Sequence, residues 1–572
     1  MSPTEKSTIE VAQPTSKDIV ETLDIEPTLS AKEEAPKWPS VPTLSVDEVV
    51  SQAVKESNSA VKEPFQFKKP IRRAAVIGTG PAGVPTIKAL HAQGIEVRAF
   101  DRNPKAGGIW AYSDAPSAKP KMPSTELAPK SKNVAPVVGI HEETVELTNE
   151  VEKSLLEQYP ASACYKDLYT NTPIKITEYI DFPGDHSKTY MWHQEFQDYL
   201  SRYLTHFGLD SLIEYNTNVE HVYKAKDEEG SECWHLTLCK SERVEGNKIH
   251  VKRWTETFDA VAIATGIHQN PKIPAFEFLE EFDARWPEKC SHSKQYRIPE
   301  PFRDLNVLVV GGHTSAVDIT RHLEGISKNV YLSYRGPREI ESNILGLIRT
   351  GVPESTIIMP ALTSLSNADG LVDGTVKFID GQTLENIDRI VFCTGFTSDY
   401  SFLDDLIIED HDEYVKLGHE SVSVPATDGQ TVFNSYRHLF FIPDPTLTFI
   451  GAPPNLTTVP FFDYQARAVA RVWAGKALLP TQKNMFSYTK EYKPVCYPLS
   501  FGAEPELLRC EDLVVWLNSH AEALGHTDLP PVLNHNKWMD TVWAHAVPNF
   551  RNDSDAKLAE VKERVKLRMA SA

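Results

Sequence analysis

The stretch Gly78-Thr79-Gly80-Pro81-Ala82-Gly83 decides the fold, because it is a complete G-x-G-x-x-G between an apolar run and a helical pattern. Residues 74–77 before it predict a buried strand, and the pattern after it predicts a helix that stops at Gly94. Asp101 ends the next predicted strand, close to the spacing of about 20 residues at which an acid binds ribose hydroxyls. The sequence therefore predicts an α/β chain that opens on a βαβ unit with a dinucleotide site.

Each position of this first fingerprint has a physical task. Gly78 permits the tight turn, Gly80 lets the backbone approach a pyrophosphate, and Gly83 permits close packing of the helix on the strand. Pro81 and Ala82 complete the loop, and the helix N-terminus stabilises negative charge through its free N–H groups. We expect these residues and the acid at the end of the next strand to bind one dinucleotide.

A second fingerprint follows the apolar run of residues 307–310 and reads Gly311-Gly312-His313-Thr314-Ser315-Ala316. It is imperfect, because His313 replaces the middle glycine and Ala316 takes the last position. A histidine there would hold the backbone further from a pyrophosphate. We still expect Gly311, Gly312, Thr314 and Ser315 to contact a second dinucleotide.

The strand after the second fingerprint carries Ser333 and Arg335 where an NAD site carries an acid. A guanidinium at that position can bind a ribose 2′-phosphate through two hydrogen bonds, and Arg338 is the nearest other candidate. The alternative for Arg335 is an ordinary surface arginine at a strand end. An acid at the first site and an arginine at the second site is the pattern expected for FAD plus NADPH.

Composition and charge narrow the function classes. The 572-residue chain has a net charge of −20, which argues against a nucleic-acid or anionic-membrane surface. Seven scattered cysteines without C-x-x-C indicate reduced thiols and supply no zinc-ligand spacing, so no metal is expected. The first residues lack the apolar core of a signal peptide, and no run approaches the roughly 18 apolar residues of a membrane span. We expect a soluble, cytoplasmic protein that acts on a small molecule, with a homo-oligomer possible.

The segment Gly107-Gly108-Ile109-Trp110 resembles the flavin-containing monooxygenase family, in which a Gly-Gly-aliphatic-Trp loop lies along the FAD. The resemblance implies that Gly108, Ile109 and Trp110 contact the cofactor, although Trp110 could be a core aromatic instead. Two further turns resemble those that mark the crossings between the FAD and NADPH domains of two-dinucleotide flavoproteins. These turns contain Thr265-Gly266 and Thr394-Gly395.

Residues 165–173 resemble the family's Leu-x-Thr-Asn segment, which implies that Thr170 and Asn171 lie against the flavin. In that reading the Asn171 amide is catalytic, because it steadies the oxygenated flavin; the alternative is a loop-capping amide. Gln465 resembles the glutamine of the family's Gln-Ala-Arg helix, whose N-terminal dipole stabilises the reduced flavin.

The family's identifying motif, F-x-G followed by a spaced His and Tyr, is degenerate in this chain. His292 and Tyr296 match it, whereas Trp286-Pro287-Glu288 replaces the Phe and the Gly. Tyr296 stands where Baeyer–Villiger relatives carry Trp, which favours heteroatom oxygenation. For His292 a structural role is the main alternative to a chemical one.

The resemblance implies an NADPH-dependent FAD monooxygenase that inserts one atom of O2 into a soft nitrogen or sulfur nucleophile through a C4a-hydroperoxyflavin. A Baeyer–Villiger or N-hydroxylating enzyme of the same superfamily is one alternative. A degenerate flavoprotein that acts as a binding module is another, motivated by His313 and Glu288. A disulfide reductase would need a redox cysteine pair, and the sequence has no C-x-x-C.

These motifs predict two Rossmann-like dinucleotide-binding domains. An NADPH domain, residues 273–388, is inserted into a discontinuous FAD domain made of residues 71–272 and 389–545. Residues 1–70 are rich in Ser, Thr, Pro, Lys and Glu and predict a disordered tail. Residues 546–572 predict an amphipathic helix, for core packing or a subunit contact, with a surface membrane helix as the alternative.

Overall fold

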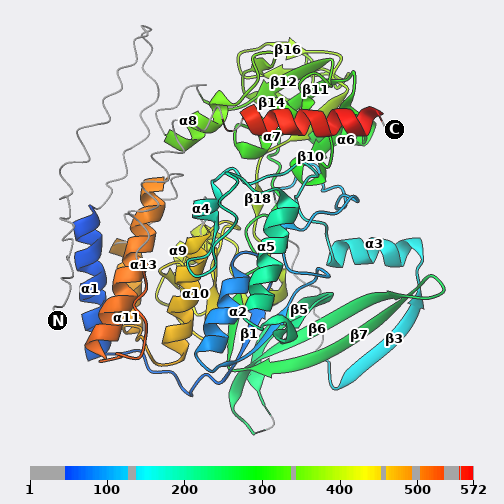
Figure 1. The fold of residues 1–572 in the computed structure, drawn as a ribbon. Coiled ribbons are helices and arrows are strands. Elements are labelled where there is room, and N and C mark those ends of the chain that lie inside the picture. Colours follow the sequence, from blue (N-terminus) through cyan, green and yellow to red (C-terminus); the bar gives the residue numbers. More distant parts are fainter. Residues whose placement is uncertain are drawn as a thin grey trace, which may run out of the picture. The chain divides into compact units, whose positions relative to one another are not determined.

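Two sheets, each built around a parallel βαβ unit, organise the chain in the computed structural model (Figure 1). The structure describes residues 45–125, 137–227, 229–336, 343–452, 459–491, 503–533, 553 and 555–570. Residues 1–44 of the predicted tail and residues 534–552 at the predicted domain end lie outside the described residues. The expected α/β class with two Rossmann-like domains is confirmed.

The first sheet has seven strands in the order β19-β20-β21-β8-β1-β2-β4. Its central strand β1 is parallel to β2 on one side and to β8 on the other. Buried on both faces, β1 is continuously apolar after its first residue, as parallel strands require. The strands of this sheet and the helix after β1 are β1 (Arg73–Ile77), α2 (Gly83–Ala92), β2 (Glu96–Phe100), β4 (Ile213–Glu214), β8 (Ala260–Ile263), β19 (Ser435–Tyr436), β20 (Phe440–Phe441) and β21 (Leu447–Phe449).

The second sheet repeats this plan with five parallel strands in the order β10-β17-β11-β12-β13. It lies in the sequence between β8 and β19, so it is an insertion in the first. The expected boundary at residue 388 is one strand too early, because β17 pairs with β10 and β11 of the second sheet. Its elements are β10 (Cys290–His292), β11 (Asn306–Val310), α7 (Thr314–Leu323), β12 (Asn329–Ser333), β13 (Ile357–Met359) and β17 (Arg389–Phe392).

Three antiparallel units complete the strands, and the sequence patterns did not predict them. The largest has the order β3-β7-β6-β5 and the smaller ones are β14-β15-β16 and β9-β18. The last of these forms where the chain crosses between the two parallel sheets. The strands are β3 (Ile140–Glu146), β5 (Thr217–Lys226), β6 (Glu232–Val244), β7 (Lys248–Phe258), β9 (Asn270–Pro271), β14 (Leu362–Ser364), β15 (Val376–Phe378), β16 (Thr383–Leu384) and β18 (Phe396–Thr397).

The predicted disordered tail is wrong for its last part, because helix α1 (Val46–Lys62) begins there with a Ser45–Glu48 capping box. Val49, Ala53 and Ala60 are buried, and α1 packs against α13 (Ala503–Ala523). The apolar face of α1 is short and interrupted by polar residues, so the composition of this segment did not indicate a helix. Helix formation here depends on a partner more than 400 residues away in the sequence.

The other helices cover the sheets and join their strands. They are η3 (Gly108–Trp110), α3 (Asn149–Gln158), α4 (Ile174–Thr177), α5 (His193–His206), η4 (Asp210–Leu212), α6 (Leu279–Arg285), η5 (Ser293–Gln295), η6 (Glu300–Phe302), α8 (Asn343–Thr350), η7 (Ser401–Leu406), α9 (His411–Leu417), α10 (Pro460–Trp473), α11 (Gln482–Glu491) and a C-terminal helix over residues 555–570. Among the described helices, none combines the length and the apolar character needed to cross a bilayer.

Candidate functional site

The first fingerprint turn follows β1, and backbone contacts require its glycines. Gly78 has φ +100°, and a Cβ there would lie 2.6 Å from the carbonyl oxygen of Ala264. A Cβ on Gly83 would lie 1.9 Å from the Gly78 carbonyl oxygen, so only glycine fits. No described side chain caps the start of α2. Gly83 N and Val84 N both donate to the Gly80 carbonyl, so the helix start can favour a bound pyrophosphate through its dipole.

Three other segments of the predicted FAD domain converge on this turn. A Cβ on Gly80 would lie 3.3 Å from Gly108 Cα, so the Gly-Gly loop packs directly on the fingerprint. Gly78 lies against Ala264 and Thr265 of the first crossing turn. A Cβ on Gly451, in the turn that leads toward α10, would lie 3.3 Å from Ala82 Cβ. The structure thus brings together loops that are far apart in the sequence.

Trp110 packs into the core beside this junction. Its ring is half-buried and meets the Phe196 ring edge-on, with the centroids 4.9 Å apart. Gln197, the next residue of α5, donates from Nε2 to the Ala106 carbonyl 3.0 Å away. Trp110 therefore anchors the Gly-Gly loop through core contacts, and its contact with the cofactor stays a prediction.

Asp101 lies directly after β2 and is buried, with 5% of its surface exposed. Its Oδ2 accepts hydrogen bonds from the Thr79 backbone N and Oγ1, each 2.7 Å away. Its Oδ1 accepts from the Asn103 backbone N at 2.8 Å and from Asn103 Nδ2 at 2.9 Å. These four bonds occupy the usual acceptor positions of a carboxylate. The acid thus holds the fingerprint loop, and the expected ribose contact stays a prediction.

Two buried polar atoms beside the junction fit a bound flavin nucleotide. Gln465 Oε1 accepts from Gly451 N at 2.8 Å, whereas Gln465 Nε2 has no hydrogen-bond partner among the described residues. Thr265 Oγ1 is likewise buried and without a described partner. An unsatisfied buried polar group costs about 1–3 kcal/mol, which a ligand that bonds to it removes. Both atoms lie on predicted FAD-binding residues.

The second fingerprint turn repeats the geometry of the first. Gly311 has φ +140°, and a Cβ there would lie 2.3 Å from the Cys393 carbonyl oxygen. Ala316, in the last slot, is fully buried, and His313 is exposed at the start of α7. The predicted NADPH residues are therefore adjacent: Gly311 and Gly312 lie in the turn after β11, and Thr314 and Ser315 begin α7.

Arg349 of α8 lies against this turn, and sequence reasoning missed it. A Cβ on Gly312 would lie 2.7 Å from Arg349 Nη2, and Arg349 Nε donates to the Gly312 carbonyl at 3.2 Å. Its guanidinium stacks 4.4 Å from the Tyr334 ring centroid. Arg349 follows no motif, so no short-range signal could have identified it.

The residues predicted to read the NADPH ribose lie at the end of β12. Arg335 is exposed, whereas the Ser333 side chain is buried. Ser333 Oγ donates to the Pro360 carbonyl at 2.6 Å and accepts from Leu362 N at 3.0 Å. Through these two bonds Ser333 connects the end of β12 to residues 360–362. Arg335 is free to extend toward solvent or a phosphate, and Arg338 lies outside the described residues.

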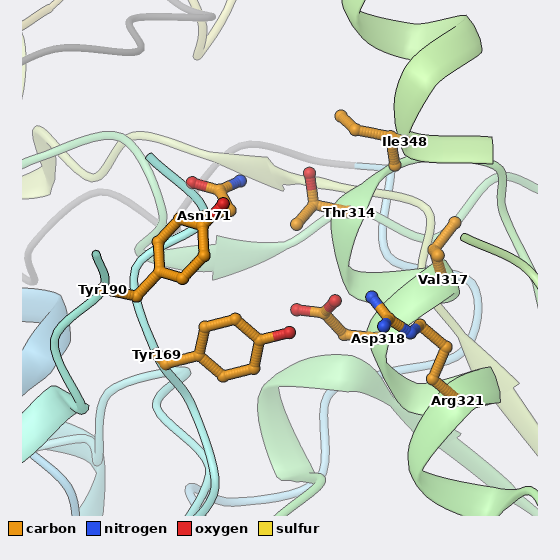
Figure 2. Close-up of a pocket in the computed structure, with 8 residues that line it drawn as sticks. All are labelled: Tyr169, Asn171, Tyr190, Thr314, Val317, Asp318, Arg321 and Ile348. Atoms are coloured by element: carbon orange, nitrogen blue, oxygen red, sulfur yellow. The ribbon is translucent and has the colours of Figure 1, made fainter. Parts of the chain in front are cut away.

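A pocket joins the two halves of the predicted site (Figure 2). Asn171 lies on one wall with Tyr169 and Tyr190, and Thr314 faces it from the start of α7. Thr170 is buried and pairs with Met191 through its backbone N and its Oγ1. The Asn171 side chain is exposed to the pocket and makes no hydrogen bond with a described residue, which does not match a loop-capping amide.

Charged groups of α7 form the opposite wall of the pocket. Asp318 accepts a 2.5 Å hydrogen bond from the Tyr165 hydroxyl, and burial together with Asp318 raises the pKa of Tyr165 well above its usual range. Arg321 lies one turn further and pairs with Asp555 of the C-terminal helix at 3.5 Å. This wall therefore keeps Tyr165 protonated. Its two charged groups both have partners: Asp318 accepts from the Tyr165 hydroxyl, and Arg321 pairs with Asp555.

The two crossing turns lie side by side, because β9 pairs with β18 and Thr394 Oγ1 donates to the Lys272 carbonyl. Close by, His292 Nδ1 accepts from Lys294 N, and burial lowers the pKa of His292 to about 3. A permanently neutral, packed imidazole supports the structural role for His292. Burial, with Arg102 nearby, lowers the pKa of Lys294 to about 8.

Comparisons with known proteins agree with this geometry. The family model described as "Flavin-binding monooxygenase-like" matches residues 157–365 and 347–496, which together exceed half of the chain. The flavin-containing monooxygenase ustF2 of Aspergillus flavus is 28% identical over 487 residues, covering 79% of this chain and 92% of its own. The flavin-containing monooxygenase FMO GS-OX-like 9 of Arabidopsis thaliana is 29% identical over 429 residues, covering 74% of this chain and 80% of its own.

Solved structures share the fold at low identity. The S-allyl-L-cysteine S-oxygenase of Allium sativum superposes with a TM-score of 0.57 at 24% identity over 86% of this chain and 98% of its own. Tmm of a Pelagibacter strain gives a TM-score of 0.58 at 19% identity over 84% and 93%. With two fingerprints, a pocket beside the second and a family match over most of the folded chain, this protein belongs to the flavin-binding monooxygenase-like family and is an oxidoreductase that uses FAD and NADPH.

Proposed function

We propose that this protein transfers one oxygen atom of O2 to a soft nitrogen or sulfur nucleophile. The observation that carries the proposal is the pocket in which Asn171 faces Thr314 of the second fingerprint. A hydrogen-bonding amide beside the nicotinamide-binding turn suits an enzyme whose two cofactors must meet. When bound, FAD and NADPH supply the oxygen activation and the hydride.

The residues of the chain bind and orient these groups. The glycine turn at Gly78–Gly83 and the N-terminal dipole of α2 hold the FAD pyrophosphate, and Gln465 Nε2 and Thr265 Oγ1 donate to the flavin nucleotide. The turn at Gly311 holds NADPH, and Arg335 binds its 2′-phosphate. These contacts together position the reacting groups, which is the main contribution a protein makes to cofactor chemistry.

Asn171 supplies a hydrogen bond that neither titrates nor oxidises. A carboxylate at this position would add negative charge beside electron-rich flavin, whereas an amide donates without charge. Tyr169 and Tyr190 form the apolar sides of the same wall and restrict water. Asp318 lies across the pocket, where its carboxylate accepts a hydrogen bond from the Tyr165 hydroxyl.

The preference for a heteroatom over a ketone follows the resemblance at Tyr296. Its ring is buried with 3% exposure, and its hydroxyl lies 3.3 Å from His322 Nδ1. Tyr296 therefore acts by shaping the wall around Tyr165, whose ring centroid is 5.6 Å away. Incubation with NADPH and either a thioether or a cyclic ketone distinguishes the two chemistries. A lactone product without a sulfoxide would replace this proposal with Baeyer–Villiger oxygenation.

The Asn171→Ala variant tests the proposed role directly. It should retain FAD and accept hydride from NADPH at the parental rate, yet release hydrogen peroxide in place of oxygenated product. Loss of one buried hydrogen bond costs about 1–3 kcal/mol. The rate of oxygenation relative to the rate of peroxide release should therefore fall about tenfold to a hundredfold. Stopped-flow reduction and peroxide yield are measured on the same sample.

Gln66→Ala is the matched control, because Gln66 is an exposed amide on the segment before β1 and outside the pocket. It should release the same proportion of hydrogen peroxide to oxygenated product as the parent enzyme. An Asn171→Ala variant that is equally well coupled would show that the amide has no part in oxygenation.

A further inference from the structure

The C-terminal helix, residues 555–570, is tied to the segment that carries Asn171. Arg568 binds the Asp167 carboxylate with both terminal nitrogens, at 2.7 Å and 3.1 Å. Its third nitrogen, Nε, donates to Glu300 Oε1 at 2.6 Å. This forked geometry fixes the direction of both partners, which a single ammonium contact would not do.

The two carboxylates come from different parts of the molecule. Asp167 lies four residues before Asn171 in the sequence and is 2% exposed. Glu300 lies in η6, just before β11 of the second sheet. One guanidinium therefore joins the loop of the proposed oxygenation residue to the domain that carries the second fingerprint. Because Asp167 is buried, it depends on cationic partners to offset the loss of water: Arg568, and at 3.8 Å Arg564 of the same helix.

A second set of contacts supports the same loop from the same helix. The Arg564 guanidinium lies 3.8 Å from the Trp192 ring centroid, and Lys557 Nζ lies 3.9 Å from it. Trp192 pairs with Tyr169 by a backbone bridge, and Tyr169 lines the pocket. Val561 and Val565 of the helix are buried. The predicted amphipathic helix thus packs within this chain.

The helix also reaches the pocket from the side of α7. Asp555 pairs with Arg321, which lines the pocket, and Figure 1 shows the C-terminal helix running beside α7. The start of the Asn171 segment has its own anchors, because Tyr165 bonds to Asp318 and Lys166 N donates to the Arg297 carbonyl. No other described side chain makes a hydrogen bond to the Asp167 carboxylate, so this carboxylate relies on the C-terminal helix, whereas Leu168 and Thr170 are held by backbone bonds to residues 191 and 193.

We infer that Arg568 is a positioning residue for oxygenation: through Asp167 and Glu300 it holds the Asn171 segment against the NADPH domain. The inference deepens the proposed function and rests on it for the role of Asn171. Arg568 does not line the pocket, so it acts through the segment that it orients. Its loss should loosen residues 165–171 and place the amide incorrectly, with hydride transfer unaffected.

Four variants, one of them a control, test the inference in the full-length holoenzyme. Arg568→Ala removes the fork, Arg568→Lys keeps the charge but not the bidentate geometry, and Lys562→Ala is the matched control. Lys562 lies on the same helix and pairs with Glu324, but both side chains are partly exposed, so the pair contributes little. Asp167→Asn removes the carboxylate that Arg568 binds, and it replaces Arg568→Ala if that variant folds poorly.

Hydrogen–deuterium exchange of the peptide that covers residues 165–171 is the first measurement, because it does not depend on catalysis. Exchange should rise about tenfold in Arg568→Ala and Asp167→Asn, less in Arg568→Lys, and not in Lys562→Ala. Peroxide yield with NADPH should follow the same order, while the rate of flavin reduction stays parental. Unchanged exchange in both Arg568→Ala and Asp167→Asn would overturn the inference.

Failure of the proposed function has a different signature. If the role of Asn171 is wrong, Asn171→Ala couples as the parent does, whatever the exchange of the segment. If Asn171→Ala is uncoupled and Arg568→Ala shows faster exchange with parental coupling, the segment is loosened without displacing the amide. That result would overturn the positioning role of Arg568 and leave the role of Asn171 intact.

Discussion

The first and second fingerprint turns share one scaffold and differ at the positions around it. β1 lies between β2 and β8, as β11 lies between β12 and β17. In both turns the first glycine has positive φ and faces a carbonyl from the crossing strand, that of Ala264 in the first and Cys393 in the second. The repeated contact shows that the first glycine serves the sheet, because the neighbouring strand leaves no room for a side chain.

The middle and last slots show where the two turns diverge. Gly80 is covered by Gly108 of the Gly-Gly loop, whereas His313 in the same slot is exposed. Gly83 lies against the turn carbonyl, whereas Ala316 in the same slot accommodates its methyl group in full burial. The second helix therefore sits less tightly on its turn. Because His313 is exposed, the second turn accommodates a side chain in its middle position without a backbone clash.

Substitutions at the last position of the two fingerprints should have the largest effect on stability. Gly83→Ala places a Cβ 1.9 Å from a backbone oxygen that cannot move without displacing β1 or α2. We expect a loss of more than about 3 kcal/mol in the free energy of unfolding and loss of FAD. Ala316→Gly should cost only about 1 kcal/mol, from helix propensity. Urea unfolding and released flavin measure both, and equal losses would contradict the difference in helix seating.

Substitutions of the two arginines at the second turn should separate the preference for NADPH over NADH from the affinity for both nucleotides. Arg335→Ala should reduce the preference for NADPH over NADH about tenfold to a hundredfold, since a charge-assisted phosphate contact supplies about 1.5–3 kcal/mol. Arg349→Ala should weaken both nucleotides alike, because Arg349 contacts the Gly312 turn. Steady-state kinetics with both nucleotides measure the preference. Retained preference in Arg335→Ala would transfer the role to another residue, Arg338 being the nearest candidate.

The crossing between the two halves should make stability depend on pH. Burial lowers the pKa of Lys294 to about 8, below its ordinary value of 10.5. Between these values the unfolded chain binds more protons than the folded chain, so this lysine makes stability rise with pH. Relative to Lys294→Met, the parent should gain about 2 kcal/mol in unfolding free energy from pH 8 to pH 10. Urea unfolding at pH 8, 9 and 10 measures the gain, and parallel pH curves would contradict it.

Local patterns were sufficient for the parts of the molecule that depend on local backbone geometry. The two glycine turns, their strands and the acid after β2 are short-range features, because a positive φ or a close carbonyl contact requires glycine at one position. The order of the motifs also indicated the insertion of one dinucleotide domain in the other. The family match confirmed FAD and NADPH as the cofactors.

Long-range packing decided the rest, and short patterns carry little information about it. Helix α1 is stable against α13, β17 joins the second sheet, and Arg349 reaches Gly312 from α8. The sequence by itself determined two nucleotide turns and a C-terminal amphipathic helix. Only the tertiary structure decided that Arg568 of that helix lies on Asp167 beside the Asn171 segment, because charge pairing between residues 401 apart depends on how the chain packs, and their spacing does not encode it.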